Sequence, residues 1–84
     1  MSKNRRKDEA LLRCIGTRIK RHRQLNNLSQ QQLANLCNIE KSNMSRLENG
    51  RVNVTMLTLR KVCIALNVSV SSFSNGVEAE VQEA

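Results

Sequence analysis

Two short helical patterns, separated by only a tight turn, occupy the middle of the chain between Leu28 and Gly50. Ser29 is a suitable N-cap for the earlier pattern, and Gln32 follows three residues later, as in a capping box. Asn38 is a turn residue, and a later helix is expected from about residue 41 to 48, where Asn–Gly stops it. So short a connection leaves no room for a strand and makes the two helices pack directly against each other.

The apolar residues of these two helices define their inward faces. Leu33, Leu36 and Cys37 are expected to point into the core from the earlier helix, and Met44 and Leu47 from the later one. The outward residues of the later helix are all polar hydrogen-bond donors: Lys41, Ser42, Asn43, Ser45 and Arg46. This outward face is either a binding surface or simply the solvated side of a short helix.

Helical patterns on both sides predict an all-α fold. A helix from about residue 8 has an apolar stripe of Leu12, Ile15 and Ile19, and asparagines end it near residue 26. Thr55 can cap a further helix and Ser69 a short fifth one. The chain is therefore expected to form a compact five-helix domain over residues 8–74, between a flexible basic arm at 1–7 and an acidic tail at 75–84. The helix after Thr55 has an expected apolar face of Met56, Leu59, Val62, Cys63 and Leu66.

The 84 residues carry a formal net charge of +7, and this charge is unevenly distributed. Residues 1–27 hold nine Lys or Arg against two acidic residues, whereas the last eleven residues carry three Glu and no basic residue. A field of this sign favours a polyanionic partner, either nucleic acid or an anionic membrane surface. A membrane is the weaker candidate, because the chain lacks a large apolar face flanked by aromatic residues and Phe73 is its only aromatic.

Cysteine usage and the absence of targeting patterns indicate a reduced, cytoplasmic protein. Cys14, Cys37 and Cys63 are odd in number and widely spaced, so we expect reduced thiols in or near the core. With His22 as the only histidine, no metal site or cofactor is expected. No apolar run approaches the ~20 residues that cross a bilayer, and none follows the basic start as in a signal peptide. One histidine and no Gly-rich phosphate loop also argue against an enzyme.

The segment LSQQQLANLCNIEKSNMSRLENGRVNVTMLTLRKVCIALNVSVSSF resembles the helix-turn-helix domain of the Cro/C1-type (XRE) family. That family includes the lambdoid phage repressors and the controller proteins of restriction–modification systems. The resemblance covers about residues 11–73 and is carried by Gln30, Ala34, Ile39, the run SRLENG and the closing LNVSVSSF. Asn38 stands where the family usually has glycine, and Val54 where proline is common; asparagine also accepts a left-handed backbone.

The resemblance implies a lambda-repressor-like domain whose later helix enters the DNA major groove with its N-terminal end first. Lys41, Ser42 and Arg46 match the family's usual base-reading positions, and Asn43 and Ser45 share their face. Arg46 or Lys41 suits guanine, and Asn43 suits adenine. The residues expected at DNA phosphates are Ser29, Gln30, Asn49 and Arg51, although Ser29 is equally suited to be a plain helix cap.

An arginine late in the first helix pairs, in the family, with the glutamate of LENG. We therefore hypothesise that Arg23 and Glu48 form a partly buried ion pair that orients the base-reading helix. The alternative is a solvated surface pair with little effect on stability.

The resemblance further implies a homodimer that reads a two-fold symmetric site, because one such domain contacts few bases. Val68, Val70 and Phe73 are the expected dimer surface, although Phe73 is equally suited to the core. The expected function is a sequence-specific regulator of transcription that binds double-stranded DNA, without a small-molecule ligand. Regulation of its own gene would suit such a protein. The alternative is an antitoxin-type protein that binds both a toxin and its own operator.

Overall fold

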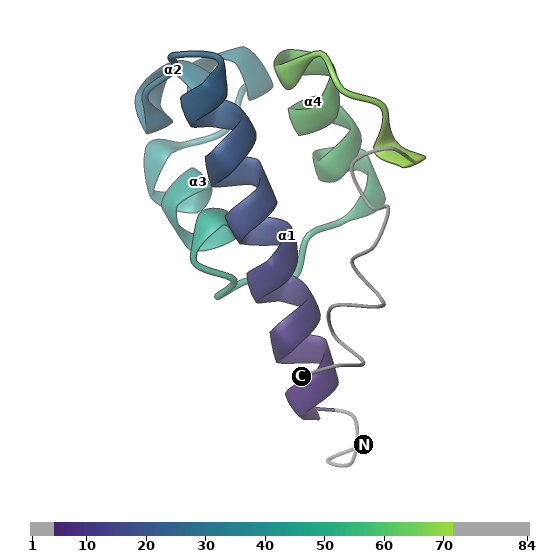
Figure 1. Cartoon of the computed structure of the whole chain (residues 1–84). Coiled ribbons are helices and arrows are strands. Elements are labelled where there is room, and N and C mark those ends of the chain that lie inside the picture. Colours follow the sequence, from purple (N-terminus) through teal and green to yellow (C-terminus); the bar gives the residue numbers. More distant parts are fainter. Residues whose placement is uncertain (1–4, 72–84) are drawn as a thin grey trace.

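The computed structural model describes residues 5–71 and contains four helices in that range: α1 (Arg5–Leu25), α2 (Gln30–Cys37), α3 (Lys41–Glu48) and α4 (Met56–Leu66). Figure 1 shows α1 passing in front, with α2 and α3 on one side of it and α4 on the other. No strand occurs in this part of the chain, which confirms the all-α prediction. α1 begins earlier than the expected residue 8, so its first turn lies in the stretch predicted as a flexible arm.

Only the start of the expected fifth helix lies among the described residues. Residues 70 and 71 are helical, whereas Phe73 and the acidic tail lie outside the described range. The described chain thus has four complete helices where five were expected. None of these helices combines the length and the hydropathy needed to span a bilayer.

The hydrophobic core lies where all four helices meet. Leu36 and Met56 were expected in it, but both predictions are wrong, because these side chains are 61% and 69% exposed. In α2 the buried stripe runs through Leu33, Ala34 and Cys37, and its centre lies roughly 100° around the helix from Leu36. Met56 is the first residue of α4 and lies to one side of that helix's buried stripe. The buried apolar residues are Ile19, Leu33, Ala34, Cys37, Met44, Leu47, Leu59, Val62, Cys63 and Leu66.

Asparagines in a left-handed conformation end three of the helices. Asn27, Asn38 and Asn67 have φ values of 58°, 57° and 60°. Asparagine tolerates this conformation better than most residues, so the chain can turn sharply without glycine. The left-handed conformation predicted at the end of α1 and at Asn38 is confirmed, and the turn between α2 and α3 is as short as the sequence indicated.

Two glycines allow α1 and the C-terminal end of α3 to touch. A Cβ added to Gly16 would lie 2.5 Å from the carbonyl oxygen of Glu48 and closer still to that of Leu47. Gly50 has a φ of 68°, and a Cβ there would lie 2.8 Å from the Cα of Arg13. The local sequence around Gly16 does not predict this contact, because a glycine inside a helix indicates only a small loss of helix stability. These contacts fix the position of α3 against α1.

Candidate nucleic-acid interface

Helix α3 has one buried face and one exposed face. Met44 and Leu47 are buried, as predicted from the apolar pattern. The last residue, Glu48, is buried as well, and Ser45 is half-buried. The exposed polar residues of the helix are Lys41, Ser42, Asn43 and Arg46. A continuous polar surface therefore runs along the side of α3 that faces away from the core.

The side chains at the two edges of this surface lie in different surroundings. Asn43 lines a small cavity of about 240 Å³ together with Leu47 and Thr58, on the side towards α4. Arg46 lies on the other side, in a groove of about 800 Å³ that also contains Arg13 and Arg51. Arg46 is thus part of a basic cluster, whereas Asn43 has a largely uncharged setting.

An ion pair joins α1 to the C-terminal end of α3. The Nε of Arg23 donates to Glu48 Oε2 at 2.6 Å, and its Nη2 donates to Oε1 at 3.1 Å. The two side chains are 11% and 1% exposed, so the contact is largely shielded from water. Nη1 of the same arginine donates to the Leu28 carbonyl at 2.8 Å. This fork geometry fixes the guanidinium against both α3 and the loop before α2.

Gln30 completes the network around Glu48. Its Nε2 donates to Glu48 Oε1 at 3.0 Å, and the side chain is only half-buried. One carboxylate therefore holds groups from α1, α2 and α3 together. Gln30 had been expected at a DNA phosphate, and the structure places it where an amide can hold the network and still reach the surface.

Ser29 forms the predicted capping box at the start of α2. Its Oγ accepts from the Gln32 backbone N–H at 3.0 Å, and its own N–H donates to Gln32 Oε1 at 2.8 Å. The prediction of the cap is confirmed. At the start of α3 the N-cap residue, Glu40, makes no such side-chain bond. The N-terminus of α2 is therefore capped by a side chain, whereas that of α3 is not.

The loop after α3 begins with a tight backbone turn. The N–H groups of Gly50 and Arg51 donate to the carbonyls of Leu47 and Arg46, at 3.2 and 2.9 Å. This pattern closes the helix, and the positive φ of Gly50 makes it possible. Asn49 and Arg51, both expected at phosphates, are exposed on this turn.

The residues expected at a dimer surface are only partly described. Val68 and Val70 are half-buried and pack against the core, while Phe73 lies outside the described residues. The outer face of α4 instead exposes Leu57 and Ile64, by 61% and 65%. These two had not been noted in the sequence, although their spacing of seven residues places them on one helical face.

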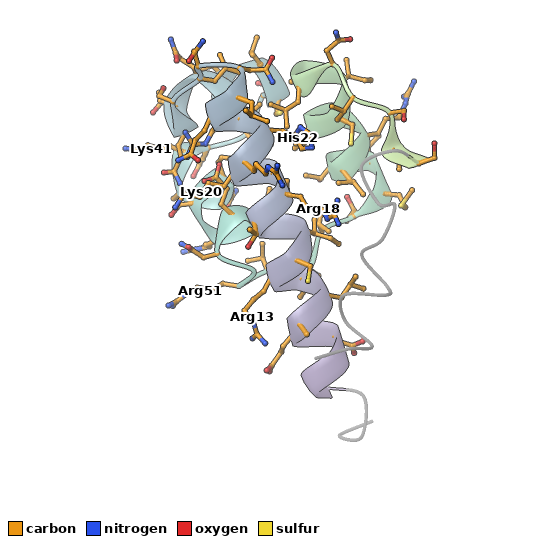
Figure 2. All side chains as sticks on the ribbon, in the orientation of Figure 1. Arg13, Arg18, Lys20, His22, Lys41 and Arg51 are labelled. Atoms are coloured by element: carbon orange, nitrogen blue, oxygen red, sulfur yellow. The ribbon has the colours of Figure 1, made fainter. Side chains whose placement is uncertain are left out.

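Basic side chains are spread over both sides of α1. Figure 2 shows Arg13, Lys20, Lys41 and Arg51 projecting on the side of α3, and Arg18 and His22 on the side of α4.

No group of His, Cys, Asp and Glu residues suited to a metal ion occurs among residues 5–71. Burial raises the pKa of the Cys37 and Cys63 thiols, with Lys61 lowering that of Cys37 to a smaller degree. All three cysteines are free thiols.

The comparison with protein families settles the class of the protein. A family model described as helix-turn-helix matches residues 19–73, which is most of the chain. The chain belongs to the Cro/C1-type helix-turn-helix family. This is a family of DNA-binding regulators of transcription. The search of the curated proteins finds no match to the chain.

Two solved structures of this type are similar to the chain. One is the clp gene regulator ClgR from Corynebacterium glutamicum, with a TM-score of 0.79 and 25% identity, over 87% of this chain and 78% of that one. The other is the restriction–modification controller protein C.AhdI from Aeromonas hydrophila, with a TM-score of 0.71 and 29% identity, over 74% of this chain and 94% of that one. Both likenesses support the all-α helix-turn-helix fold.

Proposed function

We propose that the protein is a sequence-specific regulator of transcription that binds double-stranded DNA through the exposed face of α3. Lys41, Ser42 and Arg46 read base edges in the major groove, with Asn43 and Ser45 beside them. A guanidinium donates two bonds to guanine, and an amide pairs with adenine. The observation that supports this role best is the exposure of four polar side chains on a helix whose opposite face is fully buried.

Phosphate contacts position the domain without reading sequence. Gln30 and Ser29 at the start of α2, and Asn49 and Arg51 after α3, are the proposed contacts. Ser29 contributes less than the others, because its hydroxyl already caps α2. Glu48 connects the two sets of contacts, since it bonds to Gln30 and ends the base-reading helix. The Arg23–Glu48 pair therefore holds the reading residues and a phosphate contact in fixed relation.

A single domain contacts few base pairs, so we propose a homodimer on a two-fold symmetric operator. Val68 and Val70, with Phe73, form the proposed interface. Regulation of its own gene is part of this proposal, with the protein's own concentration as the signal. Sedimentation equilibrium would test the dimer, and a monomer at micromolar concentration would contradict it.

Selection of bound duplexes from a random pool tests the proposed function. We expect a symmetric site whose affinity falls steeply as salt rises. Arg46→Ala should relax the preference at one base position per half-site, by roughly 1–3 kcal/mol. Arg60→Ala, which removes an exposed arginine from α4, is the matched control and should leave the preference unchanged. Equal affinity for every recovered and scrambled duplex would refute sequence-specific binding.

A further inference from the structure

The N-terminal part of α1 lies outside the segment that the family model matches. That match begins at residue 19, whereas α1 begins at Arg5. Figure 1 shows this end of α1 extending past the other helices. A role for residues 5–18 therefore has to be argued from the side chains and contacts of this chain itself.

Arg13 lies on this part of α1 and next to the turn that follows α3. The backbone of Gly50 is so close that an added Cβ would lie 2.8 Å from both the N and the Cα of Arg13. The Arg13 side chain is exposed, and Figure 2 shows it projecting on the same side as Arg51. Helix α1 and the turn after α3, which are far apart in sequence, thus bring two guanidinium groups to one edge of the molecule.

These two side chains share one groove with Arg46. The groove has a volume of about 800 Å³ and carries three arginines, at positions 13, 46 and 51, against one acid, Glu9. A guanidinium offers a planar set of N–H donors that matches two oxygens of a phosphate. Arginines close to one another repel unless an anion lies between them, so this arrangement favours binding of an anion.

We infer that Arg13 and Arg51 together bind a DNA backbone phosphate beside the bases contacted by α3. This inference rests on the proposed function, and it adds to it a contact made from α1. Arg46 lies in the same groove, so a phosphate held there fixes the position of α3 while Arg46 is free to reach a base edge. Arg13 therefore contributes to affinity for all sequences and not to the choice of base.

The test compares three variants of the full chain: Arg13→Gln, Arg51→Gln and Arg21→Gln. Arg21 is an exposed arginine of the same helix but lies in a different groove, with Cys14 and Leu25, so it is the matched control. Binding is measured on a duplex recovered by the selection, over a range of salt concentrations. Each of the two groove variants should lose about tenfold in affinity, and its salt slope should fall by about one. Arg21→Gln should change neither.

Single neutral methylphosphonate linkages in the same duplex locate the contact. One position per half-site should weaken binding by the wild type but have no further effect on Arg13→Gln, while Arg21→Gln keeps the wild-type response. If Arg13→Gln behaves like Arg21→Gln, or if all three variants lose affinity equally, the inference is wrong although DNA binding stands. If the wild type binds no duplex, both the inference and the proposed function are wrong. Equal melting temperatures would establish that the variants are folded.

Discussion

Helices α2 and α3 have the same length of eight residues, but different groups hold them in place. α2 is capped locally, by Ser29 and Gln32 at its start and by the left-handed Asn38 at its end. α3 has no side-chain cap at its start, and its last residue is held by Arg23 from α1 and Gln30 from α2. Helix α2 is thus stabilised by its own residues, whereas α3, the helix proposed to read DNA, is positioned by contacts with the rest of the fold.

This difference fits the proposed roles of the two helices, in which α3 reads bases and α2 supports it. A recognition helix must keep its outward side chains free, so its position is best fixed from behind and at one end. The uncapped start of α3 also leaves first-turn N–H groups for a ligand, and a helix N-terminus favours an anion. The stability of α3 should therefore depend on distant groups, and that of α2 on its own cap.

The largest effect is expected at the carboxylate that holds the end of α3. Glu48→Gln removes the charge that faces the buried Arg23, and leaving one partner of such a pair uncompensated costs roughly 3–5 kcal/mol. That is a large part of the ~5–15 kcal/mol that stabilises a typical domain. Urea denaturation should show a much lower midpoint, and DNA affinity should fall with it.

Glu40→Gln is the control for this substitution. Glu40 is exposed, and its carboxylate accepts a long hydrogen bond of 3.5 Å from Ser42 Oγ. Its replacement should change stability by less than ~0.5 kcal/mol. Replacing both members of the buried pair by apolar residues, as in Arg23→Met with Glu48→Leu, should recover much of the lost stability. A midpoint for Glu48→Gln as high as that for Glu40→Gln would show that the pair does not hold α3.

The next effect concerns Gly16, where the test is whether a substitution raises or lowers the stability of the protein. In an exposed helix, Gly→Ala stabilises by roughly 0.5–1 kcal/mol. Here the added methyl would meet backbone atoms of Leu47 and Glu48, which cannot rotate away. Gly16→Ala should therefore destabilise by about 1–3 kcal/mol and displace α3. Thr17→Ala, at an exposed position next to it, should leave the thermal midpoint nearly unchanged; a more stable Gly16→Ala variant would contradict the close contact.

A smaller effect is expected from the cap of α2. Ser29→Ala removes the acceptor of the Gln32 N–H and should cost about 1 kcal/mol. The corresponding change in α3, Glu40→Ala, should cost almost nothing, because Glu40 makes no capping bond. Thermal denaturation followed by circular dichroism would measure both. Equal losses for the two variants would remove the contrast between the helices.

The same contrast explains which features the sequence could predict. The capping box and the turn at Asn38 depend on residues a few positions apart, so both were predicted correctly. The inward position of Leu36 was not, because the pattern Leu33–Leu36–Cys37 fits a helix as well as Leu33–Ala34–Cys37. The small side chain of Ala34 lets a neighbouring helix come close, and only the packed structure shows that the buried stripe lies on that side.

The position of α3 against α1 could not be predicted from the local sequence pattern. Gly16 matters because of carbonyl groups about 30 residues further along the chain, and Arg13 because of its contact with Gly50. Arg23 and Glu48 were paired by resemblance to the family, and nothing in their local sequence gives the 2.6 Å contact. The individual roles of the residues on the outer face of α3 remain predictions.

The smallest expected effect concerns α2 alone, whose last residue is the buried Cys37. Burial raises the pKa of this thiol, and that of Cys63, above the ordinary value of 9.0. Well below that pH the thiol is protonated in both states, so it does not alter stability. As the pH rises past 9.0 the unfolded chain releases the proton first, and stability therefore falls, by at most about 1.4 kcal/mol per pH unit for each thiol.

Removing the thiol should make this alkaline loss less steep. Urea midpoints of Cys37→Ala, measured from neutral pH to above 9.0, should fall more gently than those of the wild type. Val62→Ala is the control, since it truncates a buried side chain of the same core but keeps both thiols, and should retain the wild-type slope. If Cys37→Ala and Val62→Ala decline in parallel, other groups cause the alkaline loss. The end of α2 would then be held by packing alone, without a contribution from the protonated thiol.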